Sequence, residues 1–338
     1  RIKHLCPDEV CMEFGTRRAH EFDAAIWGTR ASIIGGFDAT SNVKAAKLFN
    51  IPCSGTHAHS FVQAYEDEEV AFKKYAAAHK DCYFLVDTYD TLRSGIPTAI
   101  KVADELKAKI NFHGIRLDSG DIAYLSKEAR KMLDEAGYPN AKIVASNDLD
   151  EDTITHLKQE GACIDAWGVG TKLITAFDNP ALGAVYKLAC LENDKGEMID
   201  RLKVSENPAK LTVPGVKKVY RIINTDTGMA AGDYIALENE DVNAEQSIKL
   251  FHPTHTYLAK EVKNFKAIDI HEDIFVNGKQ VYDVPTVQES AKYFQQNKEL
   301  LWSEYLRLLN PEFYPVDLST KCWENRKEIL ERVTKKSK

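Results

Sequence analysis

Four apolar runs in the first half of this chain each end in a small polar or acidic cluster, and this pattern restricts the fold more than any other feature. Three of the four are followed by a stretch with helical periodicity. Such alternation is typical of a βα barrel, whose chemistry takes place where its strands end. The four runs with their clusters span residues 84–87, 114–121, 143–148 and 166–171.

The same periodicity predicts further elements and a division of the chain. Strands are expected at 9–14, 82–86, 111–117, 142–146 and 164–168, and helices at 17–33, 41–49, 68–79, 95–109, 122–136 and 150–160. We therefore predict an α/β fold in which residues 1–185 form an irregular βα barrel that carries the active site.

A different pattern begins near residue 183. Short strands are expected at 184–191, 197–204, 218–223 and 233–238, followed by a hairpin over 272–282 and by helices at 286–310 and 319–335. The pair Asn277-Gly278 is a typical hairpin turn. Residues 186–338 are thus predicted to form a second, smaller β-rich α/β domain with C-terminal helices.

Composition narrows the class of protein. The 338 residues carry a net charge of −7, which disfavours a general nucleic-acid binder. No signal peptide or membrane-length apolar run is visible, so we expect a cytoplasmic protein without a membrane partner. Seven cysteines in no C-x-x-C spacing favour reduced thiols over a zinc site or a disulfide framework.

The strand ends offer groups for a phosphorylated sugar. Gly168, Gly170 and Thr171 can present bare backbone N–H groups to a phosphate, although the same glycines suit a tight strand-to-helix turn. Carboxylates at such ends can hold Mg²⁺ or accept hydrogen bonds from a ribose diol, and the alternative for each is a helix cap or a solvated loop acid. The candidate carboxylates are Asp87, Asp90, Asp118, Asp121 and Asp148.

Two further segments carry chemistry. Phe14 with Arg17 and Arg18 suits a flat anionic ring, although a core aromatic with two surface cations is the plain alternative. His57 and His59 lie two apart in a small-residue loop, a spacing that does not suit a metal pair on one helix face. A histidine there is a surface residue, an acid/base group or a phosphoryl acceptor.

Taken in order, these segments resemble the nicotinate phosphoribosyltransferases, and the resemblance extends over nearly the whole chain. The motifs that carry it are EFGTRRA at 13–19, GGFDATSN at 35–42, GTHAHS at 55–60, RLDSGD at 116–121, SND at 146–148, GVGT at 168–171 and K-x-T-x-P-G-x-K at 210–217.

The resemblance implies a role for each matching residue. Phe14 would stack on the nicotinate ring, Arg17 would hold its carboxylate, and His59 would be the histidine that ATP phosphorylates. Asp118 would engage the ribose hydroxyls, and Arg116 would lie beside the pyrophosphate path. The 5′-phosphate would lie in the loop formed by Gly168, Gly170 and Thr171, and the remaining implied substrate contacts are Asp87, Ser119 and Asp148.

The resemblance also implies a reaction and its partners. Nicotinate and phosphoribosyl pyrophosphate would give nicotinate mononucleotide and pyrophosphate for NAD salvage, with ATP as co-substrate, Mg²⁺ as cofactor and a homodimer as the assembly. The family has a segment before the Phe14 strand, whereas this chain begins at Arg1. We therefore expect the natural protein to carry such an N-terminal segment.

Two other functions stay open from the residues. The accepted base could be nicotinamide or quinolinate, although Arg17 followed by Arg18 favours an acid over an amide. A non-catalytic barrel that senses phosphosugars would bind phosphoribosyl pyrophosphate tightly and release no pyrophosphate. The acidic and histidine residues at the strand ends argue against such a sensor.

Overall fold

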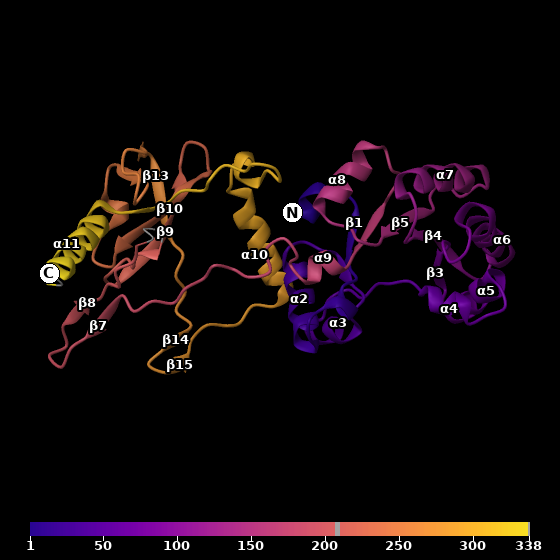
Figure 1. Cartoon of the computed structure of the whole chain (residues 1–338), viewed down its shortest axis with the longest axis horizontal. Helices are drawn as coiled ribbons and strands as arrows, with labels where there is room; N and C mark the ends of the chain where they lie inside the picture. The colour runs from indigo at the N-terminus through magenta and orange to yellow at the C-terminus, as the bar shows by residue number, and fades with distance from the viewer. Residues whose placement is uncertain (207–209, 337–338) are drawn as a thin grey trace. The chain divides into compact units, whose positions relative to one another are not determined.

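The computed structural model describes residues 1–206 and 210–336, and these form two compact units (Figure 1). The first unit comprises Arg1–Leu182 and Pro285–Phe294; the second comprises Gly183–Val284 and the described residues from Gln295 onward. The sequence placed the division at 185/186 and all of 286–310 in the second domain. In the structure residues 285–294 belong to the first unit. Val287, at the start of a helix, is an apolar side chain that is buried in the core of that unit.

A parallel sheet organises the described residues of the first unit. It has six strands in the order β2-β1-β6-β5-β4-β3 and is open between β2 and β3. The predicted fold class is confirmed in the form of an incomplete, irregular βα barrel. Its strands are β1 (Val10–Glu13), β2 (Ala39–Thr40), β3 (Asp81–Leu85), β4 (Asn111–Leu117), β5 (Lys142–Ser146) and β6 (Ala166–Val169).

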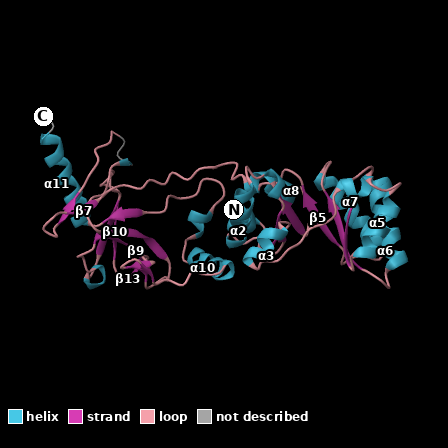
Figure 2. Cartoon of the chain, turned by 90° about the horizontal axis from the view of Figure 1, so that it is seen from below, coloured by secondary structure: helices cyan, strands magenta, loops and turns pink. Residues whose placement is uncertain are grey.

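Helices connect these strands. α5, α6 and α7 lie next to one another beside β3 and β4 (Figures 1 and 2). The predicted helix 17–33 is divided, because Thr16–Arg18 form a separate short turn before α2. The helices are α1 (Ile2–Leu5), α2 (Phe22–Ile34), α3 (Val43–Phe49), α4 (His59–Gln63), α5 (Glu68–Ala78), α6 (Ile96–Leu106), α7 (Ile122–Glu135), α8 (Glu151–Gln159) and α9 (Thr171–Ile174).

The two faces of the sheet have different neighbours, and β5 illustrates the difference. Ile143 and Ala145 are fully buried in the two cores beneath the helices. Val144 points to the other face, where it packs with Met12 and Ala166. Side chains alternate along a strand, so one strand serves both faces while its carboxyl end remains free to present polar groups.

The second unit is built on an antiparallel core. In its described residues a four-stranded sheet has the order β13-β9-β10-β16, with β16 parallel to β10. Ile222, Tyr234 and Leu250 are buried at its centre. The strands are β7 (Cys190–Glu192), β8 (Met198–Asp200), β9 (Lys217–Asn224), β10 (Ala230–Leu237), β11 (Ile248–Phe251), β12 (Ala259–Val262), β13 (Phe265–Asp269), β14 (Phe275–Val276), β15 (Lys279–Gln280) and β16 (Val316–Leu318).

Local turn chemistry predicted part of this unit well. Asn277 and Gly278 both have positive φ, as the hairpin β14–β15 requires. The predicted helix 286–310 is shorter, α10 (Val287–Glu299), and the last helix is α11 (Thr320–Lys336). Strands β11, β12, β13 and β16 were not predicted, because three to five residues on a half-exposed sheet give little periodicity.

Two expectations from composition can be compared with the structure. All seven cysteines lie within the described residues and are free thiols, and four of them are buried. Among the helices of residues 1–206 and 210–336, none has both the length and the apolar character needed to cross a bilayer.

Candidate active site

A cavity of about 440 Å³ lies at the carboxyl ends of β1, β4, β5 and β6. Most of the residues predicted to act on substrate line it, although they come from segments more than 150 positions apart. The predicted residues along its wall are Phe14, Arg17, His59, Arg116, Asp118, Asp148, Gly168, Gly170 and Thr171.

The Phe14 ring packs against the backbone of one strand end and lies near the guanidinium of another. A methyl group added at Gly168 would lie 2.5 Å from the ring, so glycine is required there for close packing. Arg116 Cζ lies 5.5 Å from the ring centroid. Gly168 therefore supports the aromatic side chain, and the phosphate contact that its motif predicts stays a prediction.

The two arginines after Phe14 are exposed on a short 3₁₀ turn and line the cavity. Arg18 Nε donates to Thr171 Oγ1 at 3.2 Å, which joins this turn to the start of α9. Among residues 1–206 and 210–336 the Arg17 guanidinium has no hydrogen-bond or ion-pair partner, so its charge is available to an anion at the cavity wall.

Arg116 is the centre of a polar network. Its three nitrogens donate to Ser146 Oγ at 2.8 Å, Thr56 Oγ1 at 2.9 Å and Asp118 Oδ1 at 2.7 Å. Ser146 also donates to the same carboxylate. Thr56 and Ser146 line the cavity as well, and sequence reasoning gave neither a role because their partners lie 60 and 30 positions away.

The structure separates the two histidines of the 55–60 loop. His57 is buried among Phe61, Phe72 and Tyr75, and its Nε2 accepts the Leu85 N–H at 3.2 Å. Burial lowers the pKa of His57 to about 4, so its imidazole is neutral near pH 7. It is a core residue.

His59 has the opposite environment. Its side chain is 37% exposed and lines the cavity. Nε2 lies 3.2 Å from Asp87 Oδ1, and Nδ1 lies 4.0 Å from Asp118 Oδ2. The Asp87 carboxylate favours a proton on Nε2, which leaves the lone pair of Nδ1 for chemistry.

Asp87 lies beneath the cavity and is not among the lining residues. Its second oxygen accepts the Asp118 N–H at 3.1 Å and the Ser119 hydroxyl at 2.6 Å. Because both of its oxygens already have donors, Asp87 orients His59 and Asp118 in this structure. Neither Asp87 nor Ser119 lines the cavity, and the substrate contacts predicted for them stay predictions.

The other acids at strand ends are of two kinds, helix caps and a residue that lines the cavity. Asp90 and Asp121 accept backbone N–H groups at the starts of helical turns, as caps do. Asp148 lines the cavity, and it and Asn147 have φ of +45° and +82°, which is uncommon for residues other than glycine. The described residues contain no group of three or more acidic, histidine or cysteine side chains suited to a metal.

The matches to known proteins agree with this geometry. Residues 10–206 match the nicotinate phosphoribosyltransferase (NAPRTase) family, and residues 216–326 match the nicotinate phosphoribosyltransferase C-terminal domain. The chain belongs to the nicotinate phosphoribosyltransferase family. The family that the motif order predicted is thus confirmed, and with it the class of enzyme, a phosphoribosyltransferase.

Individual members of the family show how much of the chain is shared. Nicotinate phosphoribosyltransferase of Bacillus subtilis (strain 168) is 62% identical over 333 residues, which cover 98% of this chain and 68% of that protein. The Caenorhabditis elegans enzyme of the same name is 32% identical, over 93% of this chain and 65% of its own length. This chain thus spans about two thirds of either relative.

A solved structure gives the same result in three dimensions. The crystal structure of human nicotinic acid phosphoribosyltransferase superimposes with a TM-score of 0.78 at 25% identity. The match covers 97% of this chain and 72% of the human chain. Both described units therefore occur together in a nicotinate phosphoribosyltransferase.

Proposed function

We propose that the protein transfers the phosphoribosyl group of phosphoribosyl pyrophosphate to nicotinate, which yields nicotinate mononucleotide and pyrophosphate for NAD salvage. The observation that carries this proposal is the meeting of Phe14, Arg17 and Asp118 around one cavity. These three supply an aromatic face, a cation for a carboxylate and an anion for a developing positive charge.

Each substrate has a place in this arrangement. The nicotinate ring stacks on Phe14 with its carboxylate toward Arg17, and the ribose hydroxyls face Asp118. The 5′-phosphate lies at the start of α9, where Gly170 and Thr171 bring backbone N–H groups that have no partner within the helix.

The reaction is a displacement at C1′ of the ribose. The lone pair of the nicotinate ring nitrogen forms the new bond as the bond from C1′ to the pyrophosphate oxygen breaks. Asp118 stabilises the positive charge that builds on the ribose, and Arg116 stabilises the leaving pyrophosphate. The ring nitrogen is already nucleophilic, so most of the acceleration comes from positioning the two substrates.

Magnesium would be shared between protein and substrate. Asp118 and Asp148 are the two carboxylates among the described residues that line the cavity, and Mg²⁺ commonly binds through one or two carboxylates together with substrate phosphates. Asp148 is the better candidate, because Arg116 and Ser146 already hold Asp118. The ion would neutralise charge on the pyrophosphate.

ATP would act through His59. Its Nδ1 would accept the γ-phosphoryl group, with ADP as the leaving group, and the Asp87 carboxylate beside Nε2 supports this role because it favours the proton on that nitrogen. The added negative charge next to Asp118 would reorganise the cavity and couple ATP hydrolysis to product formation. We further propose a cytoplasmic homodimer, as the family resemblance implies.

The proposal is tested with radiolabelled nicotinate on the full-length protein, with and without ATP. Labelled nicotinate mononucleotide and an equal amount of pyrophosphate are expected, and unlabelled nicotinamide or quinolinate should compete poorly. Tight binding of phosphoribosyl pyrophosphate without pyrophosphate release would favour the sensor instead.

His59→Ala tests the role of ATP. The variant should keep part of the transfer activity and lose stimulation by ATP, since it removes the phosphoryl acceptor and leaves Phe14 and Arg17 in place. His113→Ala is the matched control, because His113 is exposed and pairs with Asp81 away from the cavity. ATP coupling that survives in His59→Ala would refute the assignment.

A further inference from the structure

The most deeply buried acid near the cavity is Glu13, the last residue of β1 and the first letter of the motif that contains Phe14 and Arg17. Its side chain is fully buried. Three donors surround the carboxylate: the Gly15 N–H on Oε1, and the hydroxyls of Thr29 at 3.0 Å and Thr40 at 2.7 Å on Oε2. The reaction assigned above does not use this group.

A buried carboxylate is costly unless its hydrogen bonds are satisfied. None of the ion pairs formed by residues 1–206 and 210–336 includes Glu13, so hydrogen bonds alone hold its charge. The single hydrogen of the Thr29 hydroxyl is shared between Glu13 and the nearer Ala25 carbonyl at 2.8 Å, so Thr29 keeps an acceptor without Glu13. The residues that need Glu13 are therefore Gly15 and Thr40.

On one side Glu13 fixes the turn that presents Phe14 and Arg17. The Phe14 N–H donates to Val169 O at 2.8 Å, and the Arg18 N–H donates to Gly15 O at 2.8 Å. Between these two bonds, the Gly15 N–H has the Glu13 carboxylate as its acceptor. Gly15 also packs so closely on Ile174 that a methyl group there would lie 2.5 Å away.

On the other side Glu13 reaches the loop after β2. Thr40 Oγ1, which donates to Glu13, accepts the Asn42 N–H at 2.9 Å, and Asn42 Oδ1 accepts the Ala45 N–H at 3.0 Å. Ser41, between these residues, lines the same cavity as Phe14. One carboxylate thus connects two loops that both contribute to the wall of the cavity.

We propose that Glu13 is a positioning residue for the nicotinate subsite. By holding the Gly15 turn and the Thr40–Asn42 loop at a fixed separation, it sets the space between Phe14, Arg17 and Ser41. This inference rests on the proposed function. It concerns the acceptor base first, because the carboxylate of Glu13 contacts Gly15, Thr29 and Thr40 and neither Arg116 nor Asp118.

The test compares two substitutions of similar size in the full-length protein. Glu13→Gln can turn its oxygen to the Gly15 N–H and so keeps that acceptor, whereas its amide group can only donate to the threonine hydroxyls and leaves the Thr40 hydroxyl without an acceptor. Glu13→Met offers no acceptor and leaves both Gly15 and Thr40 unsatisfied. Glu13→Met should raise KM for nicotinate about tenfold, because two buried hydrogen bonds that hold the cavity wall are lost.

The remaining readouts separate positioning from general stability. KM for phosphoribosyl pyrophosphate should change less than about twofold in Glu13→Met, and Glu13→Gln, which keeps the acceptor for Gly15, should raise KM for nicotinate less than Glu13→Met does. Thr40→Val, which removes one of the two loop contacts, should have an intermediate effect, and Thr29→Val a smaller one. Equal rises in both KM values in Glu13→Met, or equal damage from Met and Gln, would overturn the inference.

Failure of the proposed function would look different. In that case the unsubstituted protein would make no nicotinate mononucleotide at all. If it does make the product and Glu13→Met leaves KM for nicotinate unchanged, then Glu13 has no positioning role and the assigned reaction still holds.

Discussion

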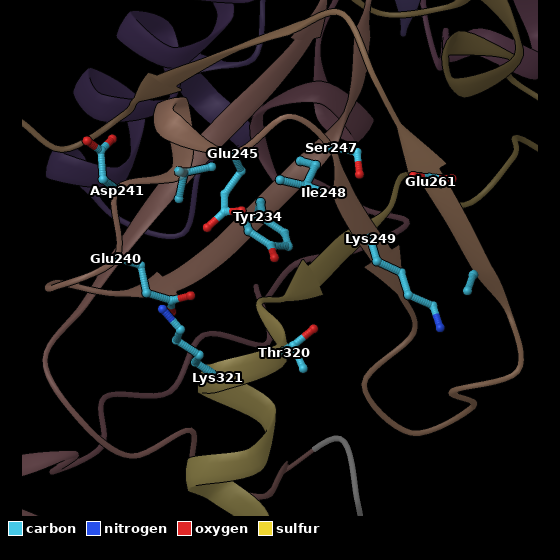
Figure 3. A pocket seen from close by; sticks show the side chains of 12 residues that line it. Tyr234, Glu240, Asp241, Glu245, Ser247, Ile248, Lys249, Glu261, Thr320 and Lys321 are labelled. Carbon is cyan, nitrogen blue, oxygen red and sulfur yellow. The ribbon is translucent and has the colours of Figure 1, made fainter.

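The two units each contain a cavity of similar size, and only the first has the organisation of an active site. The cavity in the second unit measures about 510 Å³ and the one in the first about 440 Å³. Figure 3 shows Tyr234 in the second cavity with the side chains of Glu240 and Glu245 around it. Volume alone would therefore favour the wrong unit.

A central carboxylate of the second cavity serves the fold. Glu240 Oε1 accepts the Leu237 N–H at 2.7 Å and the Ser319 hydroxyl at 2.6 Å, so it connects the end of β10 to the start of α11. In the first cavity, Arg116 and Asp118 bond to each other and to groups from separate strand ends. Convergence of strand ends, and not volume, identifies the site.

Charge separates the two cavities as well. The second is lined by more carboxylates than cations, namely Glu240, Asp241, Glu245 and Glu261 against Lys249 and Lys321. The first is lined by three arginines, Arg17, Arg18 and Arg116, against Asp118 and Asp148. Nicotinate and phosphoribosyl pyrophosphate are both anions, which the first cavity attracts and the second repels.

The largest effect that would test this comparison is expected from Asp118→Asn. The substitution keeps the shape and removes the charge that stabilises the ribose in the transition state, so kcat should fall about 100- to 1000-fold. Glu245→Gln in the second cavity is the matched control and should change kcat less than about twofold. Pyrophosphate release at saturating substrates measures both.

Two outcomes would contradict the assignment of the chemistry to the first cavity alone. Full activity in Asp118→Asn would remove the first cavity as the site of chemistry. A loss in Glu245→Gln of the same size as in Asp118→Asn would mean that the second cavity also takes part.

Much of the first cavity could be predicted from the sequence because strand ends are visible in it. An apolar run followed by Asp118 or by Gly168 marks a place where a parallel strand stops, and parallel strands stop at one edge. Contacts between distant hydroxyls and Arg116 leave no such mark. Thr56 and Ser146 are common residue types, and only the fold brings them to the guanidinium.

Arg17→Ala should have the next largest effect. Removing a cation that bonds a carboxylate should raise KM for nicotinate about 10- to 100-fold, with a smaller change in KM for phosphoribosyl pyrophosphate. The measurement is initial rate against each substrate in turn. Lys249→Ala, which removes a cation from the second cavity, is the control and should leave both constants unchanged.

An equal rise of both constants in Arg17→Ala would assign Arg17 to the phosphates and not to the carboxylate of the base. A rise caused by Lys249→Ala would again bring the second cavity into substrate binding. Arg17→Ala and Lys249→Ala thus test the comparison of the two cavities through substrate affinity, whereas Asp118→Asn tests it through the rate of the reaction.

The histidines and acids show what the sequence could not predict, namely which of two nearby residues of the same type faces the cavity. His57 and His59 have nearly the same neighbours in the sequence, yet one is buried in an aromatic cluster and the other faces the cavity. Asp121 and Asp118 belong to one motif, and the first caps α7 while the second faces the cavity. Such pairs differ only in the direction of each side chain, which packing decides after the backbone pattern is set.

The smallest of the expected effects concerns Gly168→Ala. The added methyl group would lie 2.5 Å from the Phe14 ring, so the ring must move. Overpacking of this kind costs about 1–3 kcal/mol, and the displaced ring should lower kcat/KM for nicotinate about tenfold. The matched control is Gly183→Ala in the second unit, where an added methyl group would meet no atom within 4 Å. The thermal midpoint and kcat/KM of both variants are measured together.

The two possible roles of Gly168 are distinguished by which substrate Gly168→Ala uses less well. If Gly168 supports Phe14, kcat/KM for nicotinate falls while the affinity for phosphoribosyl pyrophosphate is kept. If Gly168 lies against the 5′-phosphate, as its motif predicted, the affinity for phosphoribosyl pyrophosphate falls instead. A loss of phosphate affinity with an undisturbed Phe14 would therefore reverse the role that packing assigns to this glycine.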